Sequence, residues 1–161
     1  MATLSESLLV RASLKEVWDF YFEPRGWPAW VDGFAAVGRS EGYPERGGTL
    51  VWRSTPAGRG TVSERVIEHS PRTRHRVEWS DSASSGELLS EFAVEGDAVR
   101  VTLTLDYRLA RGGPFAALTE RLFVRGQVAR SLQRSLLRFK HEAEEAAHCG
   151  GPPGPVAVGD A

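Results

Sequence analysis

The chain has 161 residues, of which 41% are hydrophobic and 25% charged, and its formal net charge is -1. A chain of this length and composition is typical of one globular domain, because it buries a core without disulfides or metals. The small net charge excludes a global field that would favour nucleic acid or an anionic membrane, and no apolar run approaches the roughly 20 residues that cross a bilayer.

The ends of the chain carry little structural signal. Residues Met1–Glu6 contain neither a basic segment nor an apolar one, so we infer no secretory signal. Cys149 is the single cysteine, so no internal disulfide can form, and a reducing cytoplasm is the expected compartment. We expect one domain over residues 1–149 and a disordered Gly/Pro tail over 150–161.

The first predicted elements are a strand over residues 3–10 and a helix over 14–21. Ser13 is a good helix N-cap, and Glu16 three residues later completes a capping box. Pro24 ends this helix, and at most a short second helix follows it.

Six further strands are predicted from period-2 patterns separated by turn signals. In the last of them, apolar residues at odd positions from Val99 to Tyr107 alternate with polar ones. Such a strand has one covered face and one face in water, as in a curved antiparallel sheet. The expected strands are 34–39, 49–54, 60–68, 74–79, 87–94 and 99–109, with a loop at 81–86 and a hairpin turn at 95–97.

After Gly112-Gly113-Pro114 the pattern becomes helical, and one long helix is predicted from Phe115 to about Ala147. Its arginines lie largely off the apolar stripe and indicate a solvated face, with an anionic-lipid contact or a dimer surface as alternatives. The stripe consists of Leu118, Leu122, Ala129, Leu132, Leu136 and Phe139.

Only this last helix is long enough to cover the apolar face of the sheet. The expected fold class is therefore α+β: a curved seven-stranded antiparallel sheet wrapped around a long C-terminal helix, with two short helices after the first strand.

This order of elements resembles a known group of proteins. The resemblance is carried by Ser13-x-x-Glu16-Val17-Trp18-Asp19-Phe20, by Trp27-Pro28-x-Trp30, and by Gly60-x-Val62 leading to Val66-x-Glu68-x-Ser70-Pro71. Over roughly residues 3–147 the chain resembles the START-like superfamily with the helix-grip fold, in particular its bacterial polyketide cyclase/dehydrase and lipid-transport branch. The resemblance implies a hydrophobic cavity between sheet and helix. It implies no particular reaction, since the group includes cyclases, lipid carriers, quinone-binding proteins, hormone receptors and chaperone co-factors.

Three residues are candidates for proton transfer in such a cavity. Glu64 shares a strand face with Val62 and Val66, and a carboxyl buried there would have the raised pKa that a general acid or base needs. The alternatives are that Glu64 pairs with an arginine at the rim or is solvated. His75 and Tyr107 could supply a proton or polarise a carbonyl, although ordinary hydrogen-bonded burial is commoner for both residue types.

The expected ligand-binding residues are mostly aromatic and aliphatic side chains whose phase points inward. Tryptophans provide rigid apolar walls with single N–H donors, suited to a planar or isoprenoid ligand, unless several of them simply fill the core. The set is Trp27, Trp30, Trp52, Ser54, Val66, Val77, Trp79, Phe92, Leu103, Leu105, Leu118 and Leu122.

Signatures of other chemistry are missing from the sequence. The four histidines are not spaced as a metal cluster, there is no P-loop or Rossmann glycine pattern, and no nucleophile elbow surrounds a serine. We expect no metal, no cofactor, no integral membrane segment and no nucleic-acid partner.

Three functions remain open. The first is a carrier or sensor of a hydrophobic or aromatic small molecule, such as a lipid, quinone or polyketide-like compound. The second is an aromatic cyclase/dehydratase that folds a poly-β-ketone in the same cavity. The third is a protein-interaction module of the chaperone-regulator type, and a homodimer is compatible with each. Catalysis would be favoured if two of Glu64, His75, Ser54 and Tyr107 came within hydrogen-bond reach inside one cavity.

Overall fold

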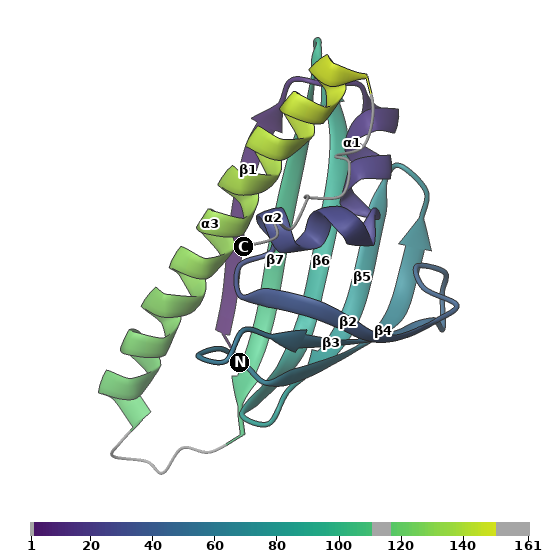
Figure 1. Ribbon diagram of the computed structural model, residues 1–161. Helices are drawn as coiled ribbons and strands as arrows, with labels where there is room; N and C mark the ends of the chain where they lie inside the picture. The colour runs from purple at the N-terminus through teal and green to yellow at the C-terminus, as the bar shows by residue number, and fades with distance from the viewer. Residues whose placement is uncertain (1, 111–116, 151–161) are drawn as a thin grey trace, which may run out of the picture.

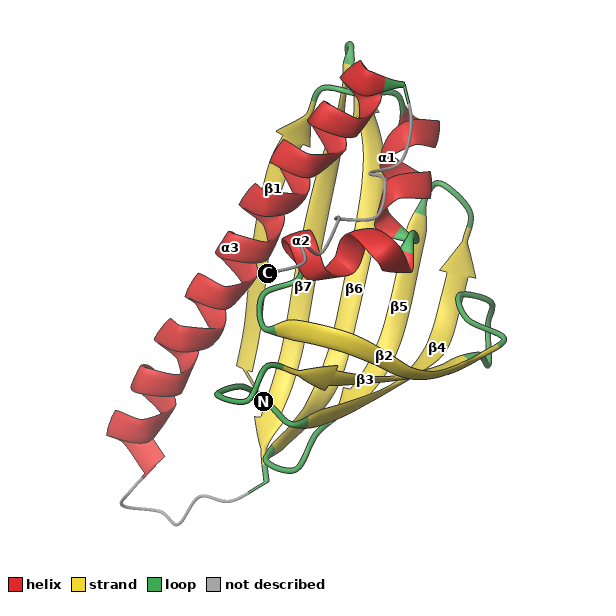
Figure 2. Cartoon of the chain, viewed as in Figure 1, coloured by secondary structure: helices red, strands yellow, loops and turns green. Residues whose placement is uncertain are grey.

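The computed structural model describes residues 2–110 and 117–150. A seven-stranded antiparallel sheet curves around the long helix α3, and the short helices lie on the same side of the sheet as α3 (Figures 1 and 2). The elements in chain order are β1 (Ala2–Val10), α1 (Leu14–Tyr21), the 3-10 helix η1 (Pro24–Gly26), α2 (Trp27–Trp30), β2 (Phe34–Glu41), β3 (Thr49–Ser54), β4 (Thr61–Ser70), β5 (Arg74–Ser80), β6 (Ser84–Glu95), β7 (Ala98–Leu109) and α3 (Ala117–Cys149).

The sheet order is β1-β7-β6-β5-β4-β3-β2, so β1 and β2 form its two edges. The chain crosses from one edge to the other through α1 and α2, which therefore lie over the concave face. β2 and β3 run at a steep angle to β5, β6 and β7 because the sheet is strongly curved (Figure 1). This is the helix-grip fold, and the predicted fold class is confirmed.

The start of α1 follows from local sequence. The hydroxyl of Ser13 accepts a hydrogen bond from the Glu16 backbone N–H at 3.2 Å, and the Glu16 carboxylate accepts one from the Ser13 N–H at 2.9 Å. These reciprocal bonds form the predicted capping box and satisfy two of the amide groups that a helix start leaves open. The helix buries Trp18 and Tyr21 against the sheet side.

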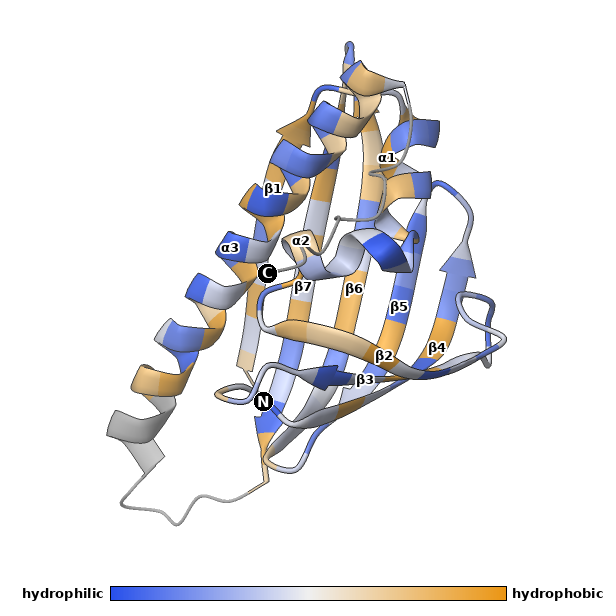
Figure 3. Ribbon diagram, in the orientation of Figure 1, coloured by the Kyte–Doolittle hydropathy of each residue, from blue (hydrophilic) through white to orange (hydrophobic). Residues whose placement is uncertain are grey.

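The predicted alternation holds along the strands, and Figure 3 shows apolar and polar residues alternating along β5, β6 and β7. The pairing is irregular at two places in β2 and at one in β4. In β4 a bulge lies between Val66 and Glu68, with Ile67 as the extra residue. Strict alternation would place His69 on the same face as Ile67. The bulge instead turns His69 toward the concave face, where its Nδ1 lies 3.0 Å from Nδ1 of His75.

The loop predicted from Asp81 to Gly86 is too long, because β6 already begins at Ser84. The Asp81 carboxylate closes a tighter turn by accepting hydrogen bonds from the Ala83 and Ser84 amides, both at 2.8 Å. Gly86 is a strand residue, and a Cβ atom there would lie 1.8 Å from the Asp106 carbonyl oxygen. Close approach of two backbones, and not a turn, accounts for this glycine.

The long helix packs on the sheet through only part of its predicted stripe. Leu132, Leu136 and Phe139 are buried, whereas Leu122 is 64% exposed. The expectation that Leu122 packs with the others is wrong, because this part of α3 is not covered by the described part of the sheet. Among the described residues, no helix combines the length and the apolar content that crossing a membrane requires. Residues 151–161 of the predicted tail (150–161) and residues 115–116 of the predicted helix lie outside the described residues.

Candidate ligand-binding cavity

The concave face of the sheet, α2 and α3 surround a cavity of about 120 Å³. A cavity of about 150 Å³ accommodates benzene, whereas sites for drug-sized ligands span about 300–1,000 Å³. The cavity is therefore close to the size that holds one ring and well below that of a drug-sized site. Its walls are aromatic or aliphatic apart from a carboxyl, an imidazole and a hydroxyl, and consist of Tyr21, Trp27, Trp30, Val31, Phe34, Tyr43, Leu50, Trp52, Glu64, His75, Val77, Leu88, Leu103, Leu132 and Ser135.

Several residues expected from sequence do line this cavity, and they come from α2, β3, β4, β5 and β7. They are Trp27, Trp30, Trp52, Glu64, His75, Val77 and Leu103. Sequence reasoning did not single out Tyr21 or Tyr43 as wall residues. Tyr21 lies on the apolar face of α1, which was a usable signal, whereas Tyr43 lies between two strands where no periodicity indicates direction.

Other expected residues lie elsewhere. Val66 is a fully buried core residue, and Phe92 packs edge-on against Trp18 at a ring separation of 5.0 Å. Leu105 is partly buried against the core, and Leu122 is exposed. The side chain of Leu118 lies outside the described residues.

Three polar or aromatic candidates border different spaces. Trp79 and Tyr107, together with Glu64, line a wide, open hollow of about 900 Å³, and most of its lining residues are charged or polar. The guanidinium of Arg59 lies 4.2 Å from the ring centre of Trp79. Ser54 lies on a groove outside the cavity, and its hydroxyl accepts a hydrogen bond from the Gly60 amide at 2.8 Å.

Glu64 is held inside the cavity by a single neutral donor. The indole Nε1 of Trp52 donates a hydrogen bond to Glu64 Oε1 at 2.8 Å. Burial raises the pKa of the Glu64 carboxyl, and the Trp52 hydrogen bond and the more distant Arg59 charge only partly oppose it. Burial also raises the pKa values of Tyr21 and Tyr43, so both phenols remain neutral.

His75 is 2% exposed and lies in an aromatic cluster with Phe22 and Tyr43. Burial lowers the pKa of His75 to about 3, and the neighbouring His69 charge acts in the same direction. Because their Nδ1 atoms are 3.0 Å apart, one imidazole donates and the other accepts. His75 Nε2 is buried and has no hydrogen-bond partner among the described residues.

The four candidates for catalysis do not converge. Glu64 lies opposite Trp79, four residues along β5 from His75, which separates the two by roughly 13 Å at about 3.3 Å per residue. Tyr107 is not part of the cavity wall; it lines the larger hollow together with Glu64, but no hydrogen bond joins these two residues in the described structure. Ser54 lies on the separate groove. A pair of proton-transferring groups within hydrogen-bond reach is therefore not formed by these residues.

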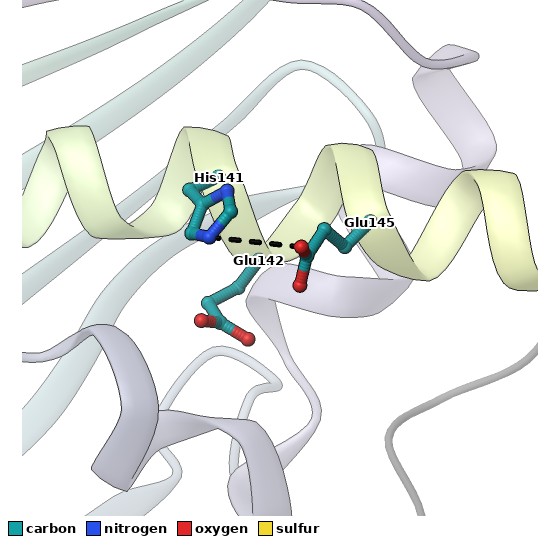
Figure 4. A group of neighbouring side chains, drawn as sticks. All are labelled: His141, Glu142 and Glu145. Carbon is teal, nitrogen blue, oxygen red and sulfur yellow. Dashed lines mark ion pairs between the residues drawn. The ribbon is translucent and has the colours of Figure 1, made fainter.

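Outside the cavity, His141, Glu142 and Glu145 lie close together on α3 (Figure 4), with potential metal-ligating atoms within 4.8 Å of one another. His141 and Glu145 form an exposed pair one helical turn apart, with a separation of 3.7 Å. This arrangement is that of a common surface pair on a helix, and nothing further in the described structure marks it as a metal site.

Solved structures with the same fold include proteins of different roles. The Zhui aromatase/cyclase from Streptomyces sp. R1128 is 18% identical with a TM-score of 0.71, over 94% of this chain and 99% of the other. The di-domain aromatase/cyclase StfQ of the steffimycin biosynthetic pathway is 15% identical with a TM-score of 0.70, over 91% of this chain and 51% of that one. The Aha1 dimer from Colwellia psychrerythraea is 14% identical with a TM-score of 0.63, over 89% and 97%. At such identities the likeness shows the fold alone.

Among curated proteins, none matches this sequence. The family model described as polyketide cyclase / dehydrase and lipid transport matches residues 1–144. This match covers most of the chain and agrees with the START-like resemblance of its motifs. The chain belongs to the polyketide cyclase / dehydrase and lipid transport family.

Proposed function

We propose that this protein binds an aromatic small molecule in the cavity between the sheet, α2 and α3. The observation that carries the proposal is an interior space of about 120 Å³ whose walls are mainly aromatic and aliphatic. Apolar surface that a ring removes from water on entering such a space is the main favourable term in binding.

The unpartnered polar atoms of the wall favour a ring that carries a hydroxyl or carbonyl group. Trp30 Nε1 and His75 Nε2 are both buried without a hydrogen-bond partner in the described structure. Leaving a buried polar group unsatisfied costs about 1–3 kcal/mol. A guest that supplies an oxygen to either nitrogen would recover part of this cost, which a hydrocarbon could not.

A cyclase/dehydratase activity is the second candidate, and the observation that favours it is Glu64. A carboxyl with a raised pKa in an apolar cavity can exchange a proton with a substrate near neutral pH. Two observations favour binding over catalysis: Glu64 forms no hydrogen bond with a second proton-transferring group in the described structure, and the cavity is too small for a folded poly-β-ketone chain.

The proposal is tested by calorimetric titration with phenol, and with benzene as a probe of equal size that lacks the hydroxyl. We expect saturable binding of both probes, with phenol the tighter. The variant Val77→Phe places extra volume in the cavity wall and should abolish binding, whereas Val94→Phe, at an exposed position of β6, should not. Equal heats for the wild type and Val77→Phe would contradict the proposal.

A separate turnover assay addresses the second candidate. Incubation with a poly-β-ketone thioester should leave its spontaneous product distribution unchanged if the protein only binds. A shift toward one cyclised product, lost in Glu64→Gln, would instead establish the cyclase.

A further inference from the structure

A groove, separate from the 900 Å³ hollow, lies directly behind the cavity. This groove has a volume of about 440 Å³ and lies between α3 and the turn that joins β3 to β4. Trp52 borders both spaces. Val31 and Leu132 line the cavity, while the adjacent residues Asp32 and Ser131 line the groove. The two spaces are therefore back to back, with Trp52 between them.

One wall of the groove is a network that joins α3 to the turn after α2. Both carboxylate oxygens of Asp32 are occupied: Arg134 donates to them at 2.8 and 3.2 Å, Arg138 at 3.3 Å and the Ser131 hydroxyl at 2.7 Å. The Arg134 hydrogen bond is the main reason that the pKa of Asp32 is lowered, so the carboxyl is ionised at neutral pH. Two guanidinium groups against one carboxylate leave this wall with an excess of positive charge.

Two more arginines line the groove. Arg59 lines the groove from the β3–β4 turn and is oriented by Asp81, whose carboxylate lies 2.7 Å away, and by the face of Trp79. Arg130 lines the groove from α3 and forms no ion pair with any residue of the described part of the chain. Of the described residues that line the groove, Asp32 is the one carboxylate, so the three arginines there outnumber the carboxylates.

We propose that the groove holds the anionic end, a carboxylate or a phosphate, of a ligand whose ring occupies the cavity behind Trp52. The inference rests on the proposed function and adds the charge and the length of the ligand. Guanidinium groups suit both anions, because their planar N–H donors match the oxygen geometry. Together the two volumes fall within the about 300–1,000 Å³ typical of small-molecule sites, which the cavity alone does not reach.

The ligand that spans both spaces must displace the Trp52 indole. Trp52 is 6% exposed, and Glu64 accepts its single N–H donor. Binding of a spanning ligand therefore changes the environment of Trp52, whereas a ligand confined to the groove leaves Trp52 against Glu64. A spanning ligand and a ligand confined to the groove therefore differ in their effect on Trp52.

The test compares probes with one carbon skeleton: 3-phenylpropanol, 3-phenylpropanoate and 3-phenylpropyl phosphate. Dissociation constants are measured calorimetrically at pH 7, at low and high salt. We expect one or both anions to bind more tightly than the alcohol, with a preference that decreases as salt screens the charges. Arg130→Gln should weaken the binding of the anions about fivefold, which corresponds to the roughly 1 kcal/mol of one exposed charge contact. It should leave the alcohol unchanged.

The matched control is Arg125→Gln, because Arg125 is exposed on the same helix but does not line the groove. Equal affinity for the alcohol and both anions, or an anion preference that is unchanged in Arg130→Gln, would overturn the inference and leave the proposed function intact. Failure of the neutral alcohol and of phenol to bind at all would overturn both. The tighter of the two anions identifies the head group.

Discussion

The indole Nε1 of Trp52 donates a hydrogen bond to Oε1 of Glu64, and the two atoms are 2.8 Å apart. The pair joins neighbouring strands, β3 and β4, inside the cavity. It places an ionisable group within an apolar wall, where burial raises the pKa of the carboxyl. The consequences for stability follow from the direction of that shift.

We expect Glu64→Gln to be more stable than the wild type at pH 7. A carboxyl whose folded-state pKa is raised favours folding while it is protonated, and this contribution is lost as the pH rises through the folded-state pKa. Glutamine keeps an oxygen for Trp52 and carries no charge. Thermal unfolding from pH 4 to 8 should show the difference at pH 7 and its disappearance toward pH 4. The control Glu78→Gln, at an exposed position of β5, should show no such trend. A constant difference across the range would contradict the account.

His75 predicts the opposite dependence on pH. Its folded-state pKa of about 3 lies below the ordinary value of 6.5, so its neutral form favours folding. This contribution is complete above pH 6.5 and is lost as the pH falls toward 3, by about 1.4 kcal/mol of unfolding free energy per pH unit. Urea unfolding of the wild type and His75→Gln between pH 4 and 7 should show this slope in their difference. The exposed His141 offers the control His141→Gln, which should run parallel to the wild type.

Removing the charge of Asp32 should lower the stability of the protein. Asp32→Asn removes the charge that binds Arg134 and Arg138, and we expect a loss of about 1–2 kcal/mol at pH 7, because hydrogen bonds to charged groups are the stronger ones. The pKa of Asp32 is lowered, so its contribution is present above the unfolded-state pKa and is lost as the pH falls through the folded-state pKa. Asp19→Asn, which breaks an exposed pair with Lys15, should cost less than about 0.5 kcal/mol. Equal losses of unfolding free energy in the two variants would show that the Asp32 network contributes no more than an exposed ion pair.

Local patterns in the sequence were sufficient for much of the fold. The Ser13–Glu16 capping box predicts where α1 begins, and the alternation from Val99 to Tyr107 predicts which face of β7 is buried. Both signals lie within a few consecutive residues. They depend on hydrogen bonds and side-chain periods that need no knowledge of distant parts of the chain.

The differences arise where distant segments meet. No local sequence signal near Ile67 predicts the bulge that turns His69 inward, because the bulge depends on how β4 pairs with β5. Gly86 has the composition of a turn residue, but the closeness of the Asp106 backbone accounts for it. Tyr43 joins the cavity wall from a loop.

The size of the cavity could not be predicted from the sequence either. Alternation places Trp52, Glu64 and Val77 inside, but the volume left among them depends on how closely α2 and α3 approach the sheet. A shift of about one ångström in that distance changes such a volume by a large fraction. Where the sequence predicts a hollow interior, the structure has a space of about 120 Å³, and a groove of about 440 Å³ lies on the other side of Trp52.

The most direct test of ring binding uses the five tryptophan indole N–H signals in a nitrogen–proton correlation spectrum during titration with phenol. Trp27, Trp30 and Trp52 line the cavity, whereas Trp18 and Trp79 do not and serve as internal controls. We predict saturable shifts of the three cavity signals, largest for Trp30 with its unpartnered N–H, and small shifts of the other two. Shifts that fail to saturate, or that are equal in all five signals, would contradict a binding site at this cavity.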